Sequence, residues 1–63
     1  MKSDIVDLDL ILVHRTTRAI LVKEDEGAEG VWLPLSRVEV DGEVGGIGTV
    51  SMRSALAIEK GLV

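Results

Sequence analysis

The chain contains no cysteine, no phenylalanine and no tyrosine, and only one residue each of tryptophan, proline and histidine. The absence of cysteine excludes disulfides and thiolate metal sites. The single imidazole, that of His14, cannot form a zinc site by itself. We therefore expect no metal and no cofactor, and the composition gives no indication of secretion.

Long apolar runs and a surplus of basic residues are also absent. No run approaches the roughly 18 apolar residues that cross a bilayer, so we expect no membrane span. Residues 1–4 lack the pattern of a signal peptide, and we expect a cytoplasmic location. The net charge of −4 argues against a nucleic-acid partner, because phosphate-binding proteins usually present a basic face.

The 63 residues are expected to form one small domain. A chain of this length buries only about 60% of the surface exposed when it is unfolded, so its stability is marginal. Disulfides and metals are excluded as additional supports, which leaves self-association. We therefore predict a homodimer. Nearly half of the residues are apolar but almost none are aromatic, which favours a β-sheet with a core of Val, Leu, Ile and Ala.

The first part of the chain predicts a hairpin. Apolar and polar residues alternate through residues 4–14, which is the period of a strand. Residues 14–18 are polar and predict its loop, and residues 19–22 predict the second strand. Both strands are apolar on both sides near the loop. We expect one such side to pack in the core and the other to be covered by sheet closure or by a second copy. This dimer or core hairpin set comprises Ile11, Val13, Ile20 and Val22.

Shorter elements are expected after this hairpin. Residues 31–33 predict a third strand, antiparallel to the second, which Pro34 ends or confines to a sheet edge. Residues 37–40 predict a further strand. The next turn is either a tight Asp-Gly turn or a longer loop within residues 41–46, and residues 47–50 predict the last strand.

The C-terminal residues predict a short helix. Ser51 is a suitable N-cap, residues 52–60 favour a helix, and Gly61 is a suitable stop. We therefore expect a mainly β fold: a small antiparallel meander or barrel-like sheet of four or five strands with one short C-terminal helix.

Two features are candidates for binding a partner. His14, Arg15 and Arg18 form the densest basic cluster of the chain, and these residues suit contact with a phosphate or an acidic protein surface. Trp32 is either the largest side chain of the core or an exposed anchor for a partner. Its place in an otherwise aliphatic chain favours the core.

The remaining polar clusters favour ordinary solvated surfaces. Asp7 and Asp9 share a strand face but lack the roughly six oxygen ligands of a calcium site. The acidic residues within 24–29 do not match a calcium-binding loop, and the glycines within 42–48 lack a nucleotide-binding fingerprint. No nucleophile motif is present either, so we expect no enzymatic activity.

Three segments resemble small, mostly uncharacterised proteins encoded by bacteriophages and prophages: Ala19–Lys23, Trp32–Ser36 with Glu39, and Lys60–Leu62. The resemblance implies a phage-type origin and the cytoplasm of a host cell. The segment Trp32–Ser36 is also similar to the turn before the last strand of Src-homology-3 domains, which bind proline-rich peptides in an aromatic-lined groove. A chain with one aromatic side chain lacks that groove, so only a similar barrel shape is implied.

These observations favour a non-enzymatic interaction module that binds a protein, including a second copy of itself. Two alternatives stay open. One is a nucleic-acid accessory protein that contacts phosphates through Arg15 and Arg18. The other is an acidic inhibitor of a host enzyme or defence complex that uses residues 24–29.

Overall fold

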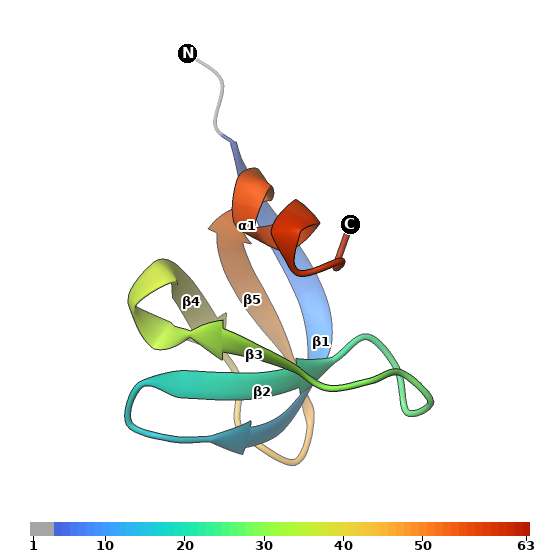
Figure 1. Cartoon of the computed structure of the whole chain (residues 1–63). Helices are drawn as coiled ribbons and strands as arrows, with labels where there is room; N and C mark the ends of the chain where they lie inside the picture. Colours follow the sequence, from blue (N-terminus) through green and yellow to red (C-terminus); the bar gives the residue numbers. More distant parts are fainter. Residues whose placement is uncertain (1–3) are drawn as a thin grey trace.

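The computed structural model describes residues 4–63 and contains five strands, one turn of 3-10 helix and one short α-helix (Figure 1). The elements follow the order β1 Ile5–Arg15, β2 Ala19–Lys23, β3 Val31–Pro34, the 3-10 turn Leu35–Arg37, β4 Val38–Asp41, β5 Ile47–Arg53 and α1 Ser54–Glu59. No helix within residues 4–63 is long and apolar enough to cross a membrane.

All strand pairs are antiparallel, and the strands form one open sheet in the order β3-β2-β1-β5-β4. Strands β1, β2 and β3 form a meander. Strands β4 and β5 form a hairpin, which is attached to the meander by the pairing of β5 with β1. Strands β3 and β4 are the edges of the sheet, and the 3-10 turn connects them. The predicted antiparallel sheet with a C-terminal helix is therefore confirmed. It is not closed into a barrel.

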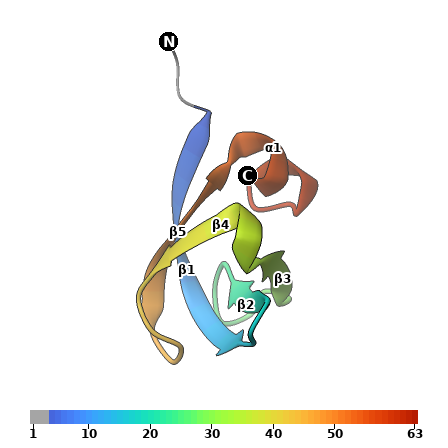
Figure 2. The ribbon, with the colours of Figure 1, turned by 90° about the vertical axis from the view of Figure 1, so that its left-hand side faces the viewer.

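Strand β1 is the centre of the sheet because its two halves pair with different strands. Residues 5–11 pair with β5, and residues 11–15 pair with β2. The register shifts between Leu12 and His14, which makes Val13 the extra residue of a β-bulge. A bulge bends its strand, and Figure 2 shows β2 and β3 turned away from the plane of β5. The bend lets one curved sheet enclose much of its own core.

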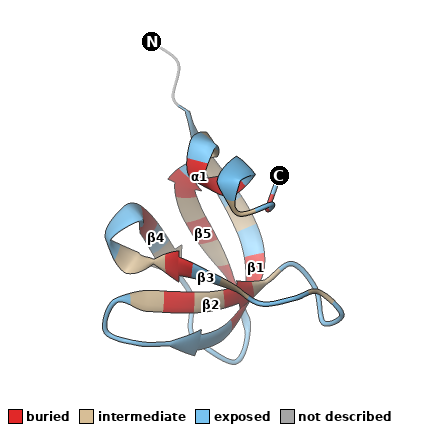
Figure 3. Cartoon of the chain, in the orientation of Figure 1, coloured by how far each residue is buried: buried red, intermediate tan, exposed pale blue. Residues whose placement is uncertain are grey.

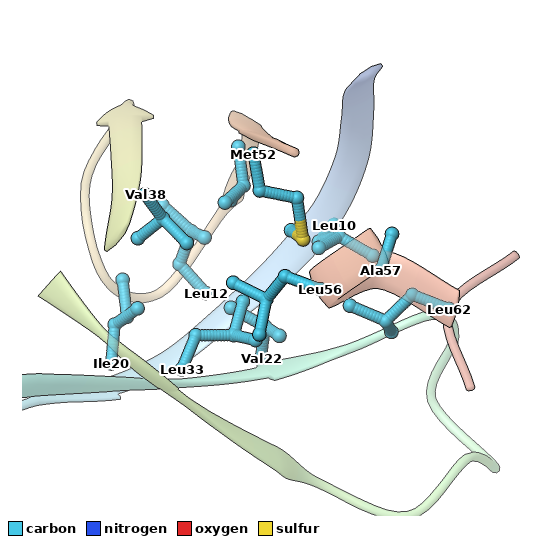
Figure 4. Close-up of a cluster of buried hydrophobic side chains, with 11 residues drawn as sticks. Leu10, Leu12, Ile20, Val22, Leu33, Val38, Met52, Leu56, Ala57 and Leu62 are labelled. Atoms are coloured by element: carbon cyan, nitrogen blue, oxygen red, sulfur yellow. The ribbon is translucent and has the colours of Figure 1, made fainter. Parts of the chain in front are cut away.

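The concave side of the sheet holds an entirely apolar core, which α1 covers by packing on β1 and β5 (Figures 3 and 4). Alternate residues of each strand point into it, as the period of two predicts. Within residues 4–63, no polar or charged side chain is buried. The buried apolar residues are Leu10, Leu12, Ile20, Val22, Leu33, Val38, Val50, Met52, Leu56, Ala57 and Leu62.

The helix starts later than the sequence predicts. Ser51 is not an N-cap but a residue of β5, and Met52 is a buried strand residue that pairs with Val6 and Val38. The prediction was wrong because Ser51 and Met52 pair with strands on both sides of β5 and Arg53 pairs with β1, and a helix would forfeit this pairing. The predicted stop at Gly61 is confirmed. It has φ of 74°, and the hydrogen bonds after α1 form a Schellman motif that buries Leu62.

Candidate functional site

Trp32 lies on the convex face of the sheet, and the interpretation of this side chain as part of the core is wrong. Its side chain is 46% exposed, whereas the next residue, Leu33, is fully buried. Successive residues of a strand point to opposite faces. Because β3 directs Leu33 into the core, it directs Trp32 outwards. An exposed tryptophan on an edge strand is available to a partner.

Three side chains form a row across the convex face, which we call the tryptophan patch: His14 of β1, Leu21 of β2 and Trp32 of β3. Leu21 pairs with both of the others in the sheet register. The rings of His14 and Trp32 also meet edge to face, with centroids 6.2 Å apart and planes at 89°. Aromatic pairs favour this arrangement, so the indole has a defined orientation.

The turn after β1, residues 15–18, presents the two arginines that the sequence identifies as candidates. Its conformation is fixed by Thr16, whose hydroxyl oxygen accepts hydrogen bonds from the backbone N–H groups of Arg18 at 3.3 Å and Ala19 at 3.1 Å. The carbonyl oxygen of Arg18 accepts a hydrogen bond from the N–H of Leu35 at 2.8 Å. We call this segment the basic turn. Arg15 and Arg18 are both exposed on it.

The basic character of this region extends well beyond the turn. No Asp or Glu occurs in residues 10–23 or 30–38, which include the whole of β2 and β3. The same stretches hold four of the seven Lys and Arg residues of the chain. The three residues of the tryptophan patch therefore lie in stretches of the chain that have no carboxylate, although the protein as a whole is acidic.

Comparison with protein-family models, with curated proteins and with solved structures finds no match for this chain. Its function has therefore to be inferred from the surfaces that the fold presents.

The four residues of the predicted dimer or core hairpin do not share one face. Ile20 and Val22 are fully buried in the core, so they are not available to a second copy. Ile11 is half-buried on the convex face, and Val13, the bulge residue, is 37% exposed. Because Ile11 pairs with Lys23, it lies on the face of the hairpin opposite to Val22. Only Ile11 and Val13 are left as contacts for a partner.

The carboxylates of β1 are engaged by hydroxyl groups of β5. The Thr49 hydroxyl donates to Asp9 at 3.0 Å, and the Ser51 hydroxyl donates to Asp7 at 2.5 Å. Glu39 and Asp41 of β4 lie beyond these hydroxyls on the same face. Among residues 4–63, no group of three His, Asp or Glu side chains is arranged to hold a metal ion. This half of the convex face is an acidic, solvated surface.

A groove of about 440 Å³, which we call the acidic groove, lies at the end of β2 opposite the basic turn. Residues 24–26 form one side, and the glycine loop 45–47 forms the other. The N–H and C=O of Leu12 hold the glycine loop in place through Gly46 and Gly45, at 2.9 and 2.8 Å. The carboxylates around the groove belong to Asp9, Glu24, Asp25 and Glu26.

Sequence reasoning identified His14, Arg15, Arg18 and Trp32 separately, but it did not bring His14 and Trp32 together. It also missed Leu21, which joins them. The alternation Val31-Trp32-Leu33 allows either Trp32 or its two neighbours to face the core. The buried partners of Leu33 decide this, and they lie on other strands.

Proposed function

We propose that this chain is a non-enzymatic interaction module of phage or prophage type, which binds a protein partner through the tryptophan patch in the cytoplasm of a host cell. The observation that supports this proposal is the half-exposed Trp32, which meets His14 edge to face and lies in a stretch of the chain without carboxylates. Trp and Arg are the residue types most enriched among those that dominate binding energy at protein interfaces.

The structure of the patch also favours binding at low entropic cost. Its three side chains stand on paired strands, and the indole is oriented by the imidazole before any partner arrives. A preorganised surface loses less conformational freedom on binding than a flexible one. The exposed Arg18 and the absence of carboxylates from residues 10–23 and 30–38 favour a partner with an acidic surface, because complementary charge speeds association and excludes wrong partners.

Trp32→Ala is expected to weaken binding of the partner about 30-fold, which corresponds to the roughly 2 kcal/mol of an interface hot spot. The partner is first isolated with the wild-type chain, identified, purified and then titrated by calorimetry. Because Trp32 is the only tryptophan, the same titration should shift its fluorescence to shorter wavelength as the indole is buried.

Ile58→Ala is the matched control, because Ile58 is also an exposed apolar residue but lies on α1, outside the patch. It should bind like the wild type. Circular dichroism of each variant establishes that it is folded. Equal affinity of the Trp32→Ala variant and the wild type would refute the proposal.

A nucleic-acid partner is the second candidate, and the exposure of Trp32 beside basic residues is the observation that favours it. Bases of single strands stack on aromatic side chains while cations contact the backbone. This candidate predicts binding to single-stranded DNA at low salt. Changing Arg15 and Arg18 to Ala should then reduce the slope of log affinity against log salt by about 1.4, at about 0.7 for each phosphate contact.

Fluorescence anisotropy of a labelled oligonucleotide measures this binding, and Lys60→Ala serves as a single-charge control remote from the basic turn. A flat titration with the wild-type chain at low salt would exclude the nucleic-acid candidate and leave the protein partner.

A further inference from the structure

The two ends of β2 carry opposite charges. The basic turn, with Arg15 and Arg18, precedes the strand, and the acidic segment 24–29 follows it. That segment has four carboxylates and no Lys or Arg. The five residues of β2 hold these two regions about 17 Å apart, at about 3.3 Å per residue. A chain built in this way cannot bring its own basic turn to its own acidic segment.

The acidic groove provides more than charge at the second end. Three large apolar residues, Leu10, Ile11 and Ile47, line it together with the carboxylates, and Ile47 is 73% exposed. Gly45 and Gly46 contribute backbone only, which keeps the groove open on that side. Among residues 4–63, no Lys or Arg lines it. Its volume of about 440 Å³ is within the range of about 300–1,000 Å³ of sites that take a ligand.

We propose that the acidic groove of one molecule receives the basic turn of a second copy, so that the chain associates head to tail. The guanidinium groups of Arg15 and Arg18 would meet the carboxylates of Glu24 and Glu26, since arginine pairs with carboxylates in planar, bidentate geometry. Their aliphatic stems would cover Ile11 and Ile47.

Two features of the molecule favour a second copy as the occupant. The basic turn is an exposed tip whose conformation is already fixed by the hydrogen bonds of Thr16, so it has little freedom to lose on docking. The acidic segment is fixed as well, because the Asp25 carboxylate accepts a hydrogen bond from the N–H of Gly27 at 2.9 Å. The contact is heterologous, and it therefore builds chains or rings rather than a two-fold dimer.

Two charge reversals test this contact. Sedimentation equilibrium at about 0.05 M salt, where the Debye length is long enough for surface charges to act, should give the wild type a mass that rises with concentration above the 6.8 kDa of one chain. Arg15→Glu with Arg18→Glu places acids against the groove, and Glu24→Lys with Glu26→Lys places bases against the turn. Each double variant alone should associate at least about tenfold more weakly than the wild type.

Mixing the two double variants should restore association, because every contact between them is again between opposite charges. A control mixture combines Arg37→Glu with Arg53→Glu and Glu39→Lys with Glu59→Lys. These residues do not line the groove or form the turn. Each substitution changes the net charge by two, so the two control variants, which start from −4, reach −8 and 0. The two test variants have the same net charges.

Three outcomes would overturn the proposal. The first is a wild type that stays at the mass of one chain at millimolar concentration. The second is association that the two test variants leave unchanged, which would place the interface elsewhere. The third is equal behaviour of the test and control mixtures, which would mean that net charge alone drives association. Circular dichroism of all four variants verifies that each is folded.

Discussion

Leu33→Ala is expected to lower the free energy of unfolding by about 2–5 kcal/mol, the usual cost of truncating a buried leucine. Leu33 is fully buried in the apolar core, where it pairs with Ile20 in the sheet register (Figure 4). A domain of 63 residues has a total stability of about 3–9 kcal/mol, at about 0.05–0.15 kcal/mol per residue. The loss of one side chain should therefore remove a large part of it.

Urea denaturation followed by circular dichroism measures this change. Ile58→Ala is the matched control, because the same kind of truncation on an exposed helix residue should change the stability by no more than about 0.5 kcal/mol. A Leu33→Ala variant as stable as this control would mean that β3 does not direct Leu33 into the core. The outward orientation of Trp32 would then be lost as well.

Gly48→Ala is expected to lower the stability by about 1–3 kcal/mol, because it overpacks a site with no free space. A Cβ on Gly48 would lie 2.7 Å from the carbonyl oxygen of Asp41 and 2.6 Å from Cδ1 of Leu12. The Leu12 side chain is itself fully buried, and the carbonyl oxygen belongs to the backbone of β4. Neither atom can move aside at small cost.

Gly46→Ala, two residues earlier in the chain and before β5 begins, is the control for this prediction. The nearest atom to a Cβ there is 3.9 Å away, so the alanine fits. Replacing glycine by alanine also restricts the unfolded chain, which stabilises a protein by about 0.4–1 kcal/mol where the native conformation permits it. Thermal unfolding should therefore give a lower midpoint for the Gly48 variant and an equal or higher one for the Gly46 variant. Equal effects would contradict the close approach of β4 and β5.

Local patterns were sufficient to predict most strands. The alternation in residues 4–14 and the polar residues after it predict the first hairpin, since an antiparallel pair can be joined by a short turn. Pro34 predicts the end of an edge strand because it has no N–H to donate, and β3 ends at this residue. Gly61 predicts the helix stop because the C′ position requires a left-handed conformation, and its φ is 74°.

Other assignments depend on residues that are distant in sequence. Ser51 and Met52 have the side chains of a helix start, but β1 and β4 provide backbone partners that keep them in a strand. The bulge at Val13 has no signature in its own segment. It lies where β1 changes its partner from β5 to β2.

The sequence by itself determined the antiparallel β architecture, the basic loop, the edge position of Pro34 and the C-terminal stop, because each depends on a period or on the covalent geometry of one residue. The tertiary structure alone decided that Trp32 is exposed beside His14 and Leu21, and that residues 24–26 and the glycine loop 45–47 form the two sides of one groove. Both properties depend on which strands pair, and in which register, and no local pattern contains that information.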